Sequence, residues 1–291
     1  MRPRFTERLG WALVAALVAF AAGPAAAADK PLVLAFVPQE NPEKLLGDVR
    51  AIDLYLEGAM GRRVEARVTT DHAAAVESLA AGAADIAFMG ALPYVMARER
   101  IGAAALLSEV YRGKPSYSGA VFVRRGSGIA GLQDLRGKSI AFADPISESG
   151  FLYPLDLFVK AGLLAPRGDP KAFFGEVYFA GGYQQAIQAV ANGLVDAAGV
   201  SVYATLLLDA DRRGDVTAIA RTPPIPSHVV VARRGLDPEP RAAFVAAMLA
   251  LNAPENRHLL RHLYGPDGYV VPDRAAYDDV AAMARKYGLI R

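Results

Sequence analysis

Residues 139–150 read Ser139-Ile140-Ala141-Phe142-Ala143-Asp144-Pro145-Ile146-Ser147-Glu148-Ser149-Gly150. The apolar run at 139–143 is typical of a strand, and residues 151–164 have the apolar spacing of a helix. A helix that begins here presents unpaired backbone N–H groups and partial positive charge. Together with the serine hydroxyls and a glycine, these groups suit a tetrahedral oxyanion. The alternative is that Ser147 only caps the helix.

The first 28 residues have the features of an export signal. Three arginines precede an apolar core at residues 9–23, and a run of small residues follows. This pattern predicts a signal peptide cleaved near Ala27 or Ala28. An uncleaved membrane anchor is less favoured, because the apolar core is shorter than the ~20 residues that a span needs. We therefore expect a soluble, exported protein.

The composition excludes several classes of protein. Without cysteine, the chain has no disulfide, thiolate metal ligand or cysteine nucleophile. The formal net charge of +2 resides in the first eight residues, so the remainder is close to neutral. A nucleic-acid partner usually requires a basic face, and none is expected. The chain beyond residue 28 is long enough for one large domain or two lobes.

Strand-like and helix-like segments alternate along the chain. Strands are expected at 32–37, 64–68, 85–90, 118–123, 139–143, 176–180, 195–200 and 228–232. Helices are expected at about 42–60, 72–81, after 93, after 150, and at 183–192, 239–251, 255–263 and 274–287. This alternation predicts mainly parallel sheets with helices on both faces.

The segments form two α/β units followed by a helical tail. We therefore expect two lobes joined by crossovers near residues 115–121 and 219–228. On this division, residues 1–28 are the signal peptide and residues 119–222 form the second lobe. Residues 29–118 and 223–291 together form the first lobe.

Four segments resemble, in order and spacing, the phosphonate-binding proteins of ABC transporters. They are Asp71-His72-x-Ala74-x-x-Glu77-x-Leu79-x-x-Gly82-x-x-Asp85-Ile86-Ala87, Leu132-x-Asp134-Leu135-Arg136-Gly137-Lys138, Asp144-Pro145-x-Ser147-x-Ser149-Gly150-x-Leu152-x-Pro154 and Ala189-Val190-Ala191-Asn192-Gly193-x-Val195-Asp196-Ala197. The third segment is the most specific, and the resemblance covers about residues 31–288.

The resemblance implies a type II periplasmic binding protein, in which two α/β lobes close by hinge motion on a ligand between them. It implies the solute-binding component of an ABC importer, with an inner-membrane permease and a cytoplasmic ATPase as partners. The implied ligand is a phosphonate or a related phosphorus oxyanion, held by Ser147, Ser149 and the backbone at Gly150. Tyr117 matches an aromatic position near this site. No cofactor or metal is expected, and a monomer is the default.

Two positions depart from the usual pattern of the family. Glu148 stands where the family usually has threonine, and Tyr183 stands where it usually has histidine. Two like charges about 4 Å apart repel by ~4 kcal/mol at an effective dielectric of about 20. Tyr183 keeps a hydrogen-bond donor but loses a possible positive charge. Both changes make the pocket less favourable to a dianion.

Three interpretations of Glu148 follow from the sequence. It points away from the ligand and serves the helix dipole, or it pairs with the ammonium of a ligand such as an aminophosphonate. In the third, the pocket no longer takes a strongly charged oxyanion, and a protonated Glu148 is one variant of this case.

Other candidate ligand contacts follow predicted strands, at the edge where α/β sheets place ligands. These are Glu40 and Asn41, Tyr94, and Ser201 with Tyr203. The alternatives are solvated loop residues for Glu40 and Asn41 and a half-buried core position for Tyr94.

An enzyme is less favoured than a binding protein. His258 and His262 have the spacing of some metal sites but no acidic third ligand between them. The sequence has no Gly-x-Ser-x-Gly elbow and no P-loop. Two alternative roles remain, namely presenting a ligand to a membrane sensor kinase or, less favoured, catalysis by an exported enzyme.

Overall fold

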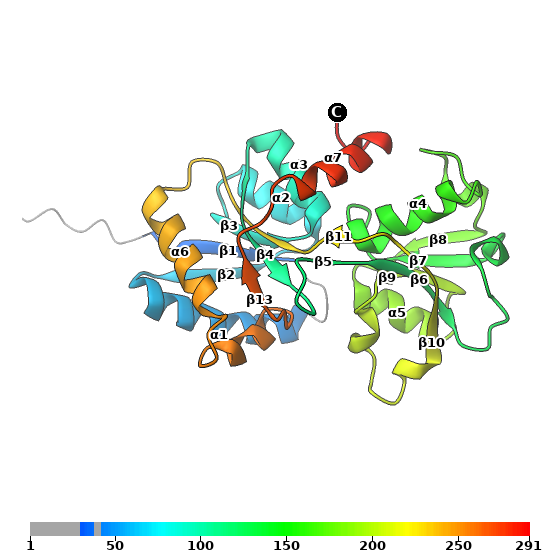
Figure 1. The fold of residues 1–291 in the computed structure, drawn as a ribbon, viewed down its shortest axis with the longest axis horizontal. Coiled ribbons are helices and arrows are strands. Elements are labelled where there is room, and N and C mark those ends of the chain that lie inside the picture. The colour runs from blue at the N-terminus through cyan, green and yellow to red at the C-terminus, as the bar shows by residue number, and fades with distance from the viewer. Residues whose placement is uncertain (1–29, 38–41) are drawn as a thin grey trace, which may run out of the picture. The chain divides into compact units, whose positions relative to one another are not determined.

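The computed structural model describes residues 30–37 and 42–291, of which Pro31–Arg291 form one compact unit (Figure 1). The signal peptide predicted at residues 1–28 and the candidate ligand residues Glu40 and Asn41 lie outside the described residues. Within the described part, every helix is too short or too polar to cross a membrane.

The first sheet has six strands in the order β13-β4-β12-β3-β1-β2. Its strands are β1 (Leu32–Phe36), β2 (Val64–Val68), β3 (Ile86–Met89), β4 (Ala104–Val110), β12 (Val229–Ala232) and β13 (Gly268–Val270). Strand β1 pairs in parallel with β2 and β3, whereas β12 is antiparallel to both β3 and β4. A strand from late in the sequence therefore lies in the middle of this sheet.

Helices cover both faces of the first sheet (Figure 1). Helices α1 (Pro42–Met60) and α6 (Pro238–Ala250) pack on the face that carries Leu34 and Phe36. The opposite face packs against α2 (His72–Ala80), α3 (Ala91–Ile101) and α7 (Ala276–Lys286). Burial on both faces explains why β1 is a continuous apolar run rather than an alternating one.

The second sheet has five strands in the order β10-β6-β9-β7-β8. Its strands are β6 (Gly119–Arg124), β7 (Ser139–Phe142), β8 (Glu176–Phe179), β9 (Ala197–Ser201) and β10 (Val216–Arg221). Helix α5 (Tyr183–Ala191) packs on one face and α4 (Tyr153–Lys160) on the other. The 3-10 turns lie at Leu132–Leu135, Pro170–Ala172, Ala204–Leu207, Arg213–Asp215 and Arg257–His262.

Both sheets are mixed, which corrects the prediction of mainly parallel sheets. The parallel pairs are those of β1 with β2 and β3 and those of β7 with β8 and β9. Strands β6 and β12 enter their sheets from the crossovers instead of from a covering helix, and both run antiparallel to their neighbours. Strands β4, β10 and β13 were not predicted. β4 is buried along most of its length and so lacks a period of two, and β13 has only three residues.

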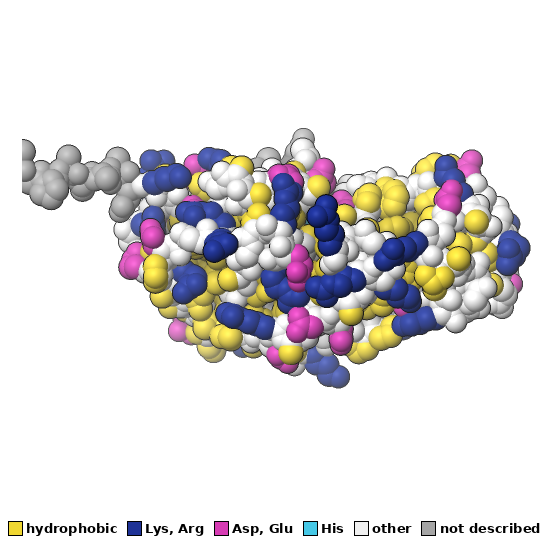
Figure 2. Space-filling view, turned by 90° about the horizontal axis from the view of Figure 1, so that it is seen from above, with side chains coloured by type: hydrophobic (Ala, Val, Ile, Leu, Met, Phe, Trp, Pro, Cys, Tyr) yellow, Lys and Arg dark blue, Asp and Glu magenta, His cyan; other side chains and the backbone are white. Residues whose placement is uncertain are grey.

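One face of the molecule carries charges of both signs. On the face shown in Figure 2, basic and acidic side chains are interspersed with apolar ones.

Two features connect the parts that contain the two sheets. Strands β5 (Ser116–Tyr117) and β11 (Ile225–Pro226) pair with each other where the chain passes between the sheets. At the end of α7, the Lys286 ammonium and the Tyr287 hydroxyl lie 2.7 and 2.8 Å from Oδ1 of Asp156 on α4. Burial raises the pKa of Asp156, but hydrogen bonds from Lys160, Lys286 and Tyr287 outweigh it and lower the pKa below its ordinary value.

We predict that Asp156→Asn lowers the free energy of unfolding by about 1–3 kcal/mol at neutral pH, because it removes charged hydrogen bonds. The folded-state pKa of Asp156 is depressed, so its contribution is complete above the ordinary value near 3.8. The contribution is lost as the pH falls through the folded pKa. Denaturant unfolding at several pH values measures the difference. An equal loss in the exposed control Asp211→Asn would contradict the prediction.

Candidate functional site

The serine-containing loop is built around a cap. The Ser147 hydroxyl accepts a hydrogen bond of 3.0 Å from the Gly150 N–H and begins a π-helical turn, Glu148–Leu152, that leads into α4. A Cβ on Gly150 would lie 2.6 Å from the Ala143 side chain and 2.8 Å from the Ser147 hydroxyl. Ser147 is therefore a cap, as the simpler interpretation holds, and Gly150 is required by packing within the loop.

A cluster of buried hydroxyl groups adjoins this loop. The Ser149 hydroxyl lies 2.8 Å from the Tyr183 hydroxyl and 2.9 Å from that of Tyr117. Burial raises the pKa of Tyr117 well above its ordinary value and that of Tyr183 to about 12, and the charge of Glu148 adds to both shifts. Both phenols are therefore protonated at neutral pH and can act as hydrogen-bond donors.

Glu148 lies in the interior, with a side chain only 1% exposed. Its Oε1 accepts a hydrogen bond of 2.8 Å from the Tyr117 hydroxyl, and its Oε2 accepts one of 3.2 Å from the Leu92 N–H. Leu92 is in the first turn of α3, which follows Gly90. Glu148 thus reaches beyond its own helix, to the start of α3 and to Tyr117. The helix dipole that it meets is that of α3, which covers the first sheet.

His228 connects Glu148 to a second buried carboxylate. Its Nδ1 lies 3.4 Å from Oε2 of Glu109, and its Nε2 lies 3.8 Å from Oε1 of Glu148. Burial disfavours the imidazolium, but the hydrogen bond and charge of Glu109 and the charge of Glu148 outweigh it. The net effect raises the pKa of His228 above its ordinary 6.5. A histidine that tends to be positive thus lies between two acids.

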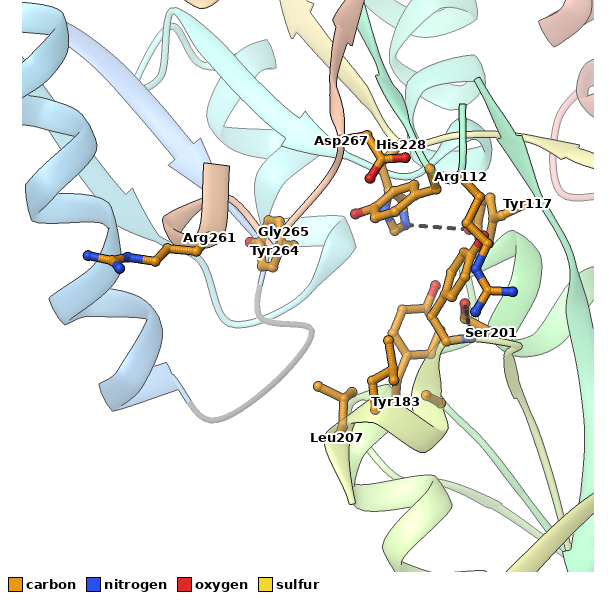
Figure 3. A pocket seen from close by; sticks show the side chains of 14 residues that line it. Arg112, Tyr117, Tyr183, Ser201, Leu207, His228, Arg261, Tyr264, Gly265 and Asp267 are labelled. Atoms are coloured by element: carbon orange, nitrogen blue, oxygen red, sulfur yellow. Dashed lines mark hydrogen bonds between the residues drawn. The ribbon is translucent and has the colours of Figure 1, made fainter. Parts of the chain in front are cut away.

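A cavity of about 420 Å³ lies beside this cluster (Figure 3). Side chains from the parts around both sheets line it, and tyrosines are prominent among them. The lining residues are Tyr111, Arg112, Tyr117, Tyr183, Ser201, Tyr203, Ala204, Leu206, Leu207, His228, Arg261, Tyr264, Gly265 and Asp267. The centroid of the Tyr203 ring is 5.2 Å from that of Tyr111 and 6.4 Å from that of Tyr117. The Arg112 guanidinium lies 5.5 Å from the centroid of the Tyr203 ring.

The structure separates the predicted site residues into three groups. Tyr117, Tyr183 and Ser201 line the cavity. Ser147, Glu148, Ser149 and Gly150 are buried in the polar cluster next to it, where Ser149 contacts both Tyr117 and Tyr183.

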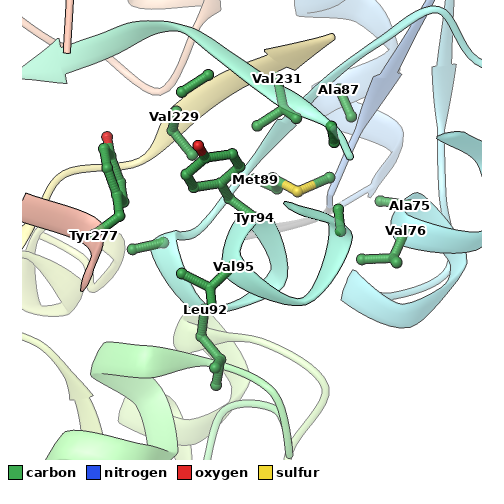
Figure 4. Close-up of a cluster of buried hydrophobic side chains, with 14 of the residues drawn as sticks. Ala75, Val76, Ala87, Met89, Leu92, Tyr94, Val95, Val229, Val231 and Tyr277 are labelled. Carbon is green, nitrogen blue, oxygen red and sulfur yellow. The ribbon is translucent and has the colours of Figure 1, made fainter. Parts of the chain in front are cut away.

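Tyr94 belongs to neither the cavity nor the polar cluster, so its predicted contact with the ligand is not supported. It lies in the apolar core, where its ring packs edge-on against Tyr277 at 4.9 Å (Figure 4). Its position after a strand satisfied the rule for ligand loops, but helix α3 turns the side chain into the core.

Sequence reasoning missed several cavity residues, notably Tyr111, Arg112, His228 and Tyr264. Tyr111 and Arg112 directly follow β4, and His228 directly precedes β12. For these three residues the one signal is their place at strand ends, but β4 itself was not predicted. Among the described residues, no group of three or more His, Asp or Glu side chains has the arrangement of a metal site.

Comparison with known proteins identifies the family. A family described as "ABC transporter, phosphonate, periplasmic substrate-binding protein" matches residues 34–277. The chain belongs to this family. The phosphate-import protein PhnD of Mycolicibacterium smegmatis is 31% identical over 249 residues, which cover 78% of this chain and 77% of that protein.

Solved structures show the same fold. PhnD1 from Prochlorococcus marinus, in complex with methylphosphonate, has a TM-score of 0.79 at 18% identity, over 90% of this chain and 99% of that one. XAC2383 from Xanthomonas citri, bound to ATP, has a TM-score of 0.71 at 21% identity. The match covers 89% of this chain and 97% of XAC2383. These structures confirm the predicted type II periplasmic binding fold. The family match confirms the predicted role as the binding component of an ABC importer.

We predict that the stabilising effect of His228 depends on pH. Because its folded-state pKa is raised, its contribution is complete below 6.5 and is lost as the pH rises through the folded value. The difference in melting temperature between the wild type and His228→Gln should therefore shrink between pH 6 and pH 9. The exposed His258→Gln variant serves as the control. A difference that stays constant or grows with pH would contradict the prediction.

Proposed function

We propose that this protein captures an organic anion in the tyrosine-lined cavity and delivers it to the permease of an ABC importer. The observation that carries the proposal is the origin of the lining residues. Tyr111 follows β4 of the first sheet, whereas Ser201 and Tyr203 lie at and after the end of β9 in the second sheet. A ligand in this cavity touches both sides, as closure of two lobes on a ligand requires.

The lobes in this proposal are those expected from the sequence. Residues 29–118 and 223–291 form one lobe, and residues 119–222 form the other. The crossovers contain β5 and β11, which place Tyr117 at the boundary. We propose binding and release without turnover.

The size and walls of the cavity suggest what it holds. Its volume of about 420 Å³ falls within the roughly 300–1,000 Å³ typical of sites for organic ligands. Inorganic phosphate or methylphosphonate would fill only a small part of it. Aromatic walls favour a planar or apolar substituent, and the Arg112 guanidinium, over the Tyr203 ring, brings positive charge to the lining. The Arg261 side chain points away from the cavity (Figure 3).

The ligands of two relatives are compatible with this proposal. PhnD1 was solved with methylphosphonate and XAC2383 with ATP, so one fold accommodates ligands that differ greatly in size. We therefore propose an acid with a planar or apolar part, such as a substituted organophosphonate or an aromatic carboxylate.

The first test is a thermal-shift screen of the purified protein. The panel contains phosphate, methylphosphonate, 2-aminoethylphosphonate, phenylphosphonate, benzoate and several neutral metabolites. A ligand at 100 times its dissociation constant adds about 2.7 kcal/mol. We expect the largest stabilisation from the acids with an aromatic or long apolar substituent. Stabilisation by neutral compounds only, or by none of the panel, would count against the proposal.

We predict that Tyr203→Ala weakens binding of the best ligand by about 10–100-fold, because a ring contact and its buried apolar surface are lost. Isothermal titration calorimetry measures the change in affinity. The matched control is Tyr178→Ala, since Tyr178 is 46% exposed on β8 and outside the cavity. Equal affinities in the two variants would place the ligand elsewhere.

A further inference from the structure

We infer that Glu148 is a specificity-determining residue, because its carboxylate fills the anion position between the two sheets from within the chain. The acid group of a ligand must then lie toward another part of the cavity wall, and a phosphate-like dianion is excluded from the position that Glu148 fills. The statement about ligands rests on the proposed binding function. The placement of the carboxylate can be tested without any ligand.

The groups around Glu148 are those that would hold an external anion. The Leu92 N–H and the Tyr117 hydroxyl both donate to the carboxylate, at 3.2 and 2.8 Å. The first turn of α3, a helix of 11 residues, adds partial positive charge. The His228 imidazole lies 3.8 Å away on the same side as the Tyr117 hydroxyl. Glu148 approaches them from the turn that precedes α4, on the opposite side of the boundary.

The backbone at the start of α3 is shaped for this carboxylate. A Cβ on Gly90 would lie 2.4 Å from Oε2 and 2.6 Å from Oε1 of Glu148. Real Cβ atoms do not approach so closely, so the carboxylate would have to shift, and its burial and its two hydrogen bonds oppose that shift. The absence of a side chain at Gly90 and the carboxylate at Glu148 are therefore complementary features on two distant parts of the chain.

The neighbouring hydroxyls are already engaged with one another. Ser147 accepts from the Gly150 N–H, and Ser149 lies within hydrogen-bond distance of both Tyr117 and Tyr183. A second anion placed here would meet the Glu148 carboxylate in a water-poor environment, where repulsion between like charges is strong. The cavity is better suited to an acid whose charge lies toward Arg112, over the Tyr203 ring.

The binding test compares the wild type with Glu148→Thr. Threonine removes the carboxylate and leaves the donors of Leu92 and Tyr117 to an external oxyanion. Titration calorimetry with inorganic phosphate and with methylphosphonate should show a gain in affinity of about 100-fold or more in the variant. The exposed Glu255→Thr variant has the same change in net charge and should bind like the wild type. Equal affinity of the wild type and Glu148→Thr for both anions would overturn the inference.

A double-mutant cycle tests the placement of the carboxylate alone. Gly90→Ala should lower the melting temperature of the wild type markedly, because the new methyl group meets the carboxylate, and should cost much less in a Glu148→Thr background. An equal cost in both backgrounds would overturn the placement. If the coupling appears but no solute of the panel binds either protein, the proposed function fails while the placement stands.

Discussion

The buried carboxylate of Glu148 imposes the strongest constraint on this structure. An uncompensated charge in the interior is very costly, so its surroundings must supply donors. Two donors come from separate parts of the chain, the Leu92 N–H at the start of α3 and the Tyr117 hydroxyl on β5. The imidazole of His228, at the approach to β12, lies 3.8 Å from the same carboxylate. These contacts hold the loop before α4 against the side that carries the first sheet.

The rest of the site follows from this arrangement. His228 is held between Glu148 and Glu109, so the polar cluster continues as far as β4. The tyrosines that line the cavity extend from the same cluster, with Tyr117 and Tyr183 shared between the cluster and the cavity wall. A ligand in the cavity therefore lies next to a preorganised set of donors whose nearest anion is already part of the protein.

Much of the fold and part of the site could be predicted from the sequence. The apolar runs of β1 and β7 and the caps at Asp71 and Ser147 identify elements locally. The loop that contains Glu148 was found because serines and a glycine lie between a strand and a helix, and Glu148 itself was singled out because it departs from the pattern of the family. Its partners could not be found in this way, since Leu92 acts through its backbone and Gly90 through a missing side chain. Tyr111 and Arg112 reach the cavity only through the pairing of β4, which depends on contacts between distant strands.

A crystal structure of the protein grown at neutral pH in the presence of phosphate would show which group holds the anion position. We expect the Glu148 carboxylate within hydrogen-bond distance of the Leu92 N–H and the Tyr117 hydroxyl, with no tetrahedral density beside them. A phosphate ion bound to those two groups, with Glu148 displaced from them, would contradict this expectation.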